Sequence, residues 1–138
     1  MRDHELTLEQ SCTAPAARVW DILVRPNLWW GDDVLLEPHA GGAFHEPWRD
    51  KHGQHHTRGR VQEIEVPRLL RLSWRDDDWP FETEVSLQLV ERGEGSLIVL
   101  AHRGWSGAPE TLRAELVSAH RGGWQHHLKN LSARAEAQ

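Results

Sequence analysis

The N-terminal part of the chain alternates between apolar and polar residues and then changes to a helical period. Over His4–Cys12 every second residue is mostly apolar and its neighbours are polar, which is typical of a half-buried strand. A helix is expected to start at Thr13-Ala-Pro15, because proline is tolerated in a first turn, and to end at Pro26. Asn27–Trp30 predicts a second, short helical turn.

Strand-like segments dominate the middle of the chain. Gly59 interrupts the longest of them and is expected to mark a β-bulge. Asp76–Asp78 is expected to form a solvated turn, because three adjacent carboxylates repel one another. The six predicted strands cover residues 34–37, 43–45, 54–66, 69–74, 82–91 and 96–103.

The last predicted element is a helix of roughly 25 residues that starts near Pro109. At 100° per residue, one of its sides carries Leu112, Leu116, Ala119, His120, Gly123, Trp124, His127 and Leu131. A single helix cannot cover a sheet of six or seven strands completely. The sequence therefore predicts an α+β fold in which a curved antiparallel sheet grips the long helix and leaves a gap between them.

Length and charge narrow the classes of function. The 138 residues are expected to form one domain, 1–138, and the net charge of −5 argues against binding to nucleic acid or to anionic membranes. No apolar run approaches the length of a membrane span, and the first residues lack a signal-peptide core, so the expected location is the cytoplasm. The single cysteine, Cys12, excludes an internal disulfide and is expected to be a small buried apolar residue.

The order of elements, together with several short motifs, resembles the START/polyketide-cyclase superfamily, which has the helix-grip fold. Within it the chain is similar to bacterial single-domain homologues of the activator of the 90-kDa heat-shock protein ATPase. The similarity covers almost the whole chain and rests on residues 14–20, Trp29-Trp30, 41–44, 59–64, 67–70, 72–74 and 120–124, with Leu128 and Leu131.

The resemblance implies a cavity between sheet and helix for a small apolar or aromatic molecule. It does not specify the molecule, because superfamily members bind lipids, sterols, polyketides or plant hormones, and some catalyse cyclisation or dehydration in the same cavity. The eukaryotic activator also carries a separate chaperone-binding domain, for which this chain has no room.

The histidines do not predict a metal site. Zinc needs three or four ligands around one point, whereas His55 and His56 are neighbours on a strand and point to opposite faces. On the long helix, His120 and His127 share a face but lie two turns apart. We therefore expect neither a metal nor a cofactor.

Five residues are candidates for the lining of the gap. His127 lies near the middle of the inner helix face, and His102 shares strand parity with apolar neighbours. A buried imidazole must satisfy its nitrogens, either within the protein or with a ligand, and both interpretations stay open for these histidines. The predicted ligand-binding residues are Trp74, His102, His120, Trp124 and His127.

Three classes of function remain. The first is binding of a small apolar or aromatic molecule, and the second is a small enzyme that uses an inward histidine as a general acid or base in the same cavity. The third is a protein-interaction or stress-response module, in which exposed loop tryptophans form a contact patch, for example in a homodimer. The tryptophans in or next to predicted loops are Trp29, Trp30, Trp48, Trp79 and Trp105.

Overall fold

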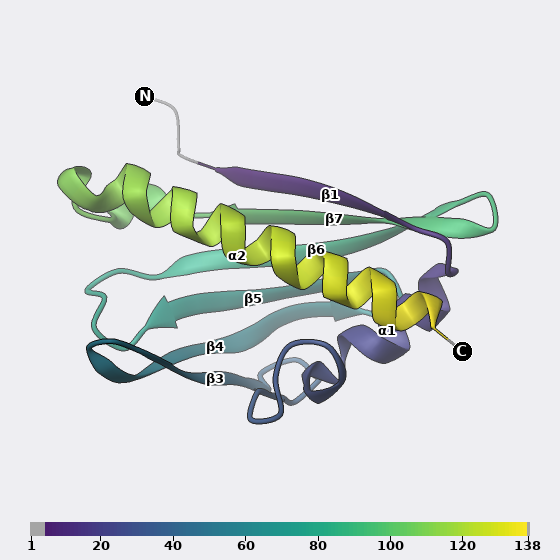
Figure 1. Ribbon diagram of the computed structural model, residues 1–138, viewed down its shortest axis with the longest axis horizontal. Helices are drawn as coiled ribbons and strands as arrows, with labels where there is room; N and C mark the ends of the chain where they lie inside the picture. The colour runs from purple at the N-terminus through teal and green to yellow at the C-terminus, as the bar shows by residue number, and fades with distance from the viewer. Residues whose placement is uncertain (1–4, 138) are drawn as a thin grey trace.

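A curved antiparallel sheet and one long helix form the body of the protein (Figure 1). The computed structural model describes residues 5–137, within which seven strands form one sheet in the order β1-β7-β6-β5-β4-β3-β2. The strands are β1 (Leu6–Cys12), β2 (Leu35–Leu36), β3 (Ala43–Asp50), β4 (Gly53–Glu65), β5 (Leu69–Asp76), β6 (Thr83–Arg92) and β7 (Gly95–Arg103). The helices are α1 (Ala16–Leu23) and α2 (Glu110–Glu136), with 3₁₀ turns η1 (Pro26–Leu28) and η2 (Trp105–Gly107).

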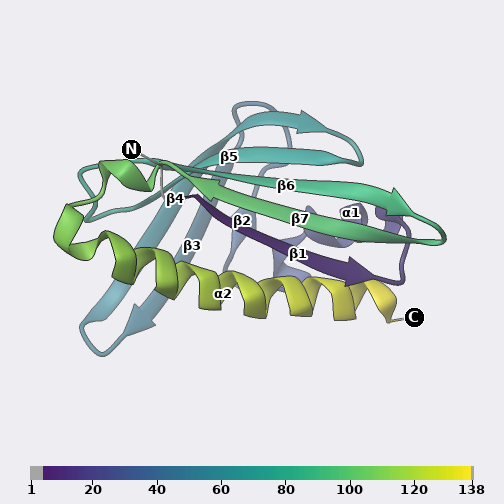
Figure 2. The ribbon, with the colours of Figure 1, turned by 90° about the horizontal axis from the view of Figure 1, so that it is seen from above.

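This architecture confirms the predicted α+β helix-grip fold. The helix α2 crosses one face of the sheet diagonally, and the sheet curves so that β3 and β4 extend past the helix (Figures 1 and 2). Helix α1 and the turn η1 follow β1 and close the end of the sheet near the C-terminus. None of the helices within residues 5–137 combines the length and apolarity needed to cross a bilayer.

The two halves of α2 differ in burial. Its C-terminal half packs on β1 and α1 and buries Trp124, Leu128, Leu131, Ser132 and Ala135. In the N-terminal half, Leu112, Ala119 and Gly123 of the predicted inner face are exposed. Ala119 and Gly123 face the gap between helix and sheet, as predicted, whereas Leu112 does not. The reason is that the sheet bends away from the helix there, so this half of α2 has little to pack against (Figure 2).

The middle strands also differ from the prediction. The strand expected to end at His45 continues to Asp50 as β3, although it contains Pro47. Proline is tolerated there because β2 pairs only with Phe44 and His45, so the rest of β3 is an edge strand. Strand β5 likewise continues past its predicted end at Trp74, to Asp76. Asp76 is half-buried and does not lie in the solvated turn that was predicted.

The β-bulge was predicted at Gly59 but lies further along β4, between Val61 and Glu63. Gly59 has a different structural role. A Cβ atom at this position would overlap the backbone carbonyl oxygen of Ser73 on β5, so only glycine permits this close approach of the two strands.

We therefore expect the substitution Gly59→Ala to lower the free energy of unfolding by roughly 1–3 kcal/mol, because β4 and β5 must separate locally. Gly122→Ala on the exposed side of α2 is the matched control. Its Cβ meets no neighbour, and alanine favours a helix over glycine by about 1 kcal/mol. Urea unfolding of the two variants should move in opposite directions, and equal effects would contradict this role of Gly59.

Candidate functional site

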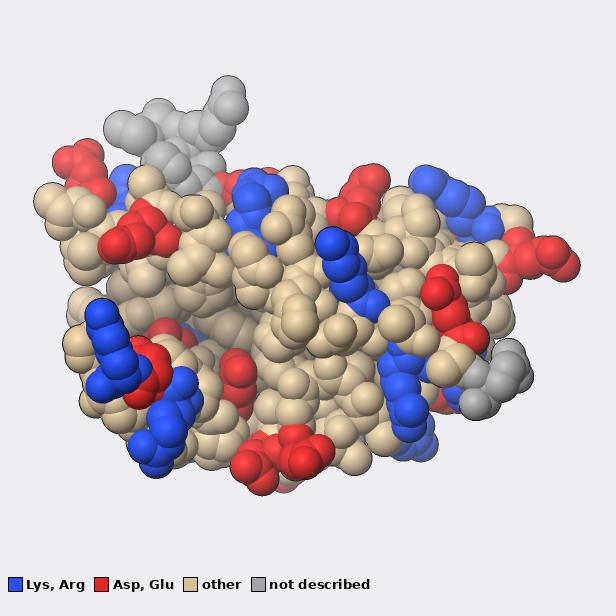
Figure 3. Space-filling model, viewed as in Figure 1, with Lys and Arg blue, Asp and Glu red and all other residues tan. Residues whose placement is uncertain are grey.

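An open pocket of about 400 Å³ lies between the N-terminal half of α2 and the strands β3, β4 and β5. Figure 3 shows the surface hollowed at this place, below the helix and beside the β3–β4 hairpin. The helix contributes residues spaced by three or four, which share one helical face: Leu116, Ala119, His120, Gly123, Trp124 and His127. The pocket exists because the sheet diverges from the helix where the helix carries small side chains.

Tryptophans form the apolar wall of the pocket. Trp30, Trp48, Trp74 and Trp124 all line it. Trp30 packs against two of them, with its ring centroid 5.9 Å from that of Trp74 and 5.3 Å from that of Trp124. Because Trp30 and Trp48 are only half-buried, their rings remain available to a bound molecule.

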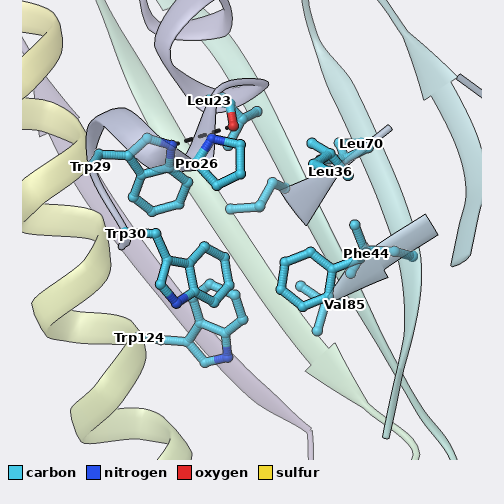
Figure 4. A pocket seen from close by; sticks show the side chains of 11 residues that line it. Leu23, Pro26, Trp29, Trp30, Leu36, Phe44, Leu70, Val85 and Trp124 are labelled. Carbon is cyan, nitrogen blue, oxygen red and sulfur yellow. Dashed lines mark hydrogen bonds between the residues drawn. The ribbon is translucent and has the colours of Figure 1, made fainter. Parts of the chain in front are cut away.

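Almost no space remains behind this wall. The cavity enclosed there measures about 20 Å³, which is room for about one water molecule. Figure 4 shows Trp30, Phe44 and Trp124 directed into this space, and Trp29 beside it donates a hydrogen bond from Nε1 to the Leu23 carbonyl at 3.3 Å. Of the two spaces, only the open pocket is large enough for a small organic molecule.

Three polar residues cross the floor of the pocket side by side. Glu46 on β3 is in register with Thr57 on β4, and Thr57 is in register with Asp76 on β5. We call these three residues the acidic rung. The Thr57 hydroxyl donates to Asp76 Oδ1 at 2.6 Å and accepts a hydrogen bond from Trp48 Nε1 at 3.0 Å. Trp30 Nε1 donates to Glu46 Oε2 at 3.1 Å.

Burial affects both carboxyl groups of the rung. Desolvation raises the pKa of Glu46, and the charge of Asp76 adds to this effect, whereas the hydrogen bond from Trp30 opposes it. Desolvation also raises the pKa of Asp76, against the hydrogen bond from Thr57. The two carboxyl groups are therefore close enough to interact and are costly to hold ionised without a counter-charge.

The fold agrees with what comparison with known proteins finds. The sequence profile of the activator of Hsp90 ATPase homolog 1-like proteins matches residues 13–136. The chain belongs to this family. It shares the START-like fold of the wider SRPBCC superfamily, whose members commonly bind hydrophobic ligands. No curated protein matches the chain at a significant level.

Several solved structures share this fold. CalU16 from Micromonospora echinospora is 26% identical, with a TM-score of 0.74 over 96% of this chain and 76% of CalU16. CV1439 from Chromobacterium violaceum is 23% identical, with a TM-score of 0.79 over 97% of this chain and 98% of CV1439. DynU16, a protein in the dynemicin biosynthetic locus, is 19% identical, with a TM-score of 0.78 over 99% of this chain and 48% of DynU16.

Four of the five residues predicted from the sequence line the open pocket: Trp74, His120, Trp124 and His127. The Nδ1 atom of His120 lies 2.9 Å from the Leu116 carbonyl, so it carries the proton of the neutral ring. The Nδ1 atom of His127 is buried and has no partner within residues 5–137. Burial lowers the pKa of both rings, that of His127 to about 4.

The fifth residue, His102, lies behind the wall and does not line the pocket. Trp124 Nε1 can only donate, so His102 Nδ1, at 3.1 Å, accepts this hydrogen bond. His102 Nε2 therefore carries the proton and donates to the Thr83 hydroxyl at 2.8 Å, which donates in turn to the Trp74 carbonyl at 2.8 Å. Both ring nitrogens of His102 are thus hydrogen-bonded within the protein. This is the first of the two interpretations given for a buried histidine.

The two acidic residues of the pocket were not predicted. Glu46 was missed because the strand was expected to end at His45, although Phe44, Glu46 and Trp48 already follow the period of a strand. Asp76 was assigned to a solvated turn, and nothing in its local sequence indicates that Thr57 lies beside it. Within residues 5–137 no group of His, Cys, Asp or Glu side chains is arranged to hold a metal ion.

The loop tryptophans do not form the exposed patch that a homodimer was expected to use. Trp29, Trp79 and Trp105 are buried, and Trp105 has no exposed surface at all. Trp30 and Trp48 line the pocket instead. The residues on which the interaction hypothesis depended therefore belong to the core and to the pocket wall.

The buried histidines predict how stability depends on pH. Burial lowers the pKa of His102 to about 2, whereas an unfolded histidine titrates near 6.5. As the pH falls below about 6.5, the unfolded chain binds a proton here that the folded chain does not, so His102 lowers stability by about 1.4 kcal/mol per pH unit. This loss continues until the pH approaches the folded pKa.

Urea unfolding between pH 5 and pH 7.5 tests this linkage. The variant His102→Gln should unfold more easily at pH 7.5 because it disrupts the hydrogen bonds to Trp124 and Thr83. Its stability should also depend less on pH, by about 1.4 kcal/mol per unit below pH 6. Other titrating groups cancel in this comparison, so parallel curves for the two proteins would show that His102 is not held neutral.

Proposed function

We propose that the protein binds a small molecule with an apolar or aromatic body in the open pocket between α2 and β3–β5. The observation that carries this proposal is the pocket itself, about 400 Å³ in volume and walled by four tryptophans. Pockets for small ligands usually measure about 300–1,000 Å³ and combine apolar walls with a few polar groups. The binding of hydrophobic ligands by the superfamily supports the same function.

The residues of the pocket have different roles in this proposal. The indoles of Trp30 and Trp48 contact the ligand directly, because they are half-buried and face the open space. Trp74 and Trp124 are buried, also line the pocket, and pack against Trp30. His127 packs against Trp30, with 4.6 Å between the ring centroids, and offers a polar edge to the ligand. His102 acts on the site only through Trp124.

Gly123 allows a direct test, since it lines the pocket and a Cβ atom there would meet open space. We expect Gly123→Leu to occupy part of the pocket and to weaken the binding of a neutral aromatic probe by at least about tenfold, or 1.4 kcal/mol. The probe is N-phenyl-1-naphthylamine, whose fluorescence rises in apolar surroundings. If the probe is recovered chemically unchanged after incubation, the protein binds it without converting it.

Gly122→Leu provides the matched control. Gly122 is the preceding residue of α2, is exposed and does not line the pocket, so the same side chain there should leave probe affinity unchanged. Equal affinities for Gly123→Leu and the unmodified protein would place the probe elsewhere. Absence of saturable binding by the unmodified protein would contradict the proposed function for probes of this class.

A further inference from the structure

The acidic rung gives the floor of the pocket a charge that a purely apolar ligand does not need. Glu46 and Asp76 are the acidic residues of the pocket lining, and no lysine or arginine within residues 5–137 lines it. His120 and His127 do not supply a positive charge either, because burial lowers the pKa of each ring. The arginines on neighbouring strand positions, Arg58 and Arg75, line a different hollow.

Each carboxylate keeps one oxygen for a ligand. Glu46 Oε2 and Asp76 Oδ1 accept hydrogen bonds from Trp30 and Thr57, respectively. The other two oxygens, Glu46 Oε1 and Asp76 Oδ2, accept no side-chain or backbone hydrogen bond within residues 5–137. Neither is among the buried atoms that lack a partner, so both oxygens remain accessible from solvent.

The hydrogen bonds that hold the rung also fix its geometry. Thr57 and Trp48 form a chain of donors that ends on Asp76, and Trp30 fixes Glu46 from the other side. The rung is therefore preorganised, and a positive group that enters between the two carboxylates meets acceptors that are already oriented. The same carboxylates, held partly out of water with the pKa of each raised, gain most from such a counter-charge.

The tryptophan wall suits the same kind of ligand. Indole is the best of the aromatic side chains at attracting a cation through its π-system. Trp30 is hydrogen-bonded to Glu46, and Trp48 to Thr57, which in turn donates to Asp76. Trp74 also lines the pocket, is only 4% exposed, and its Nε1 has no hydrogen-bond partner among the described residues. An acceptor atom on the ligand body would satisfy this donor.

We propose that the ligand is an organic cation, a protonated amine carried on an apolar or aromatic body, whose ammonium group lies between Glu46 and Asp76. This inference rests on the proposed function and specifies the ligand class for the same pocket. It also predicts that anionic ligands of the same shape are rejected, because their charge would face two carboxylates with no lysine or arginine of residues 5–137 in the lining.

Three naphthalenes of similar size differ in charge: 1-naphthylmethylamine, which is protonated at pH 7.5, 1-naphthalenemethanol, which is neutral, and 1-naphthoate, which is anionic. Titration calorimetry with the unmodified protein should give at least tenfold tighter binding of the amine than of the alcohol, and weaker binding of the naphthoate than of either. An alcohol or naphthoate that binds as tightly as the amine would overturn the cation proposal while leaving the pocket as a binding site.

Variants of the acidic rung test whether its two carboxylates cause the preference for the amine. Glu46→Gln combined with Asp76→Asn should reduce the preference for the amine over the alcohol to less than threefold, because the amine loses its counter-charges. Asp77→Asn is the matched control, because this neighbouring carboxylate is exposed and lines the other hollow. It should keep the full preference, and a loss of preference in the control alone would contradict the assignment to Glu46 and Asp76.

The failure of this proposal differs from the failure of the proposed function. If the neutral probe and the alcohol bind at the pocket but the amine gains nothing, the cation proposal is wrong and the binding site stands. If neither the three naphthalenes nor N-phenyl-1-naphthylamine binds, the cation proposal and the proposed function are both wrong.

Discussion

The hydrogen bond between Trp124 Nε1 and His102 Nδ1 connects the long helix to the sheet at the point where the two begin to separate. Beyond this bond, towards the C-terminus, α2 packs on β1 and α1 and buries Leu128, Leu131, Ser132 and Ala135. Before it, the helix carries exposed and half-buried residues and faces open space. The bond continues through His102 and Thr83 to the backbone of β5, so one chain of donors spans the helix and three strands.

This arrangement explains why the pocket is open at the side and closed behind. In a helix-grip fold, a ligand cavity can lie deep between sheet and helix. Here that space is filled by indole and phenyl rings, with about 20 Å³ remaining. The rings that fill it also form the wall of the outer pocket, so the same packing that stabilises the core shapes the binding surface. Trp30 has both roles, since it lines both spaces.

Much of the fold could be predicted from the sequence because its elements follow strong periods. The alternation in β1 and β6 and the long helical pattern after Pro109 are local signals, and they set the order of the elements correctly. The bulge position and the length of β3 were wrong because both depend on strand pairing. Pro47 obscured β3, and it is tolerated only because β2 is too short to cover that part of the edge.

The site was less predictable than the fold, and for a related reason. Trp74, His120, Trp124 and His127 could be selected from helix and strand parity alone. By strand parity, His102 would be expected to line the pocket. Its hydrogen bonds to Trp124 and Thr83, which are 22 and 19 residues away in the sequence, hold it in the core instead. Glu46 and Asp76 come together only through Thr57 on the strand between them, which no local pattern indicates.

The central claim is that the open pocket, and not the space behind the tryptophan wall, receives the ligand. The chain has eight tryptophans, so an ¹H–¹⁵N spectrum of the labelled protein contains one indole N–H signal for each. Titration with N-phenyl-1-naphthylamine should shift the signals of Trp30, Trp48, Trp74 and Trp124, assigned by single Trp→Phe variants. A larger shift at Trp29, which lines only the space behind the wall, than at Trp48 would place the molecule there and contradict the account.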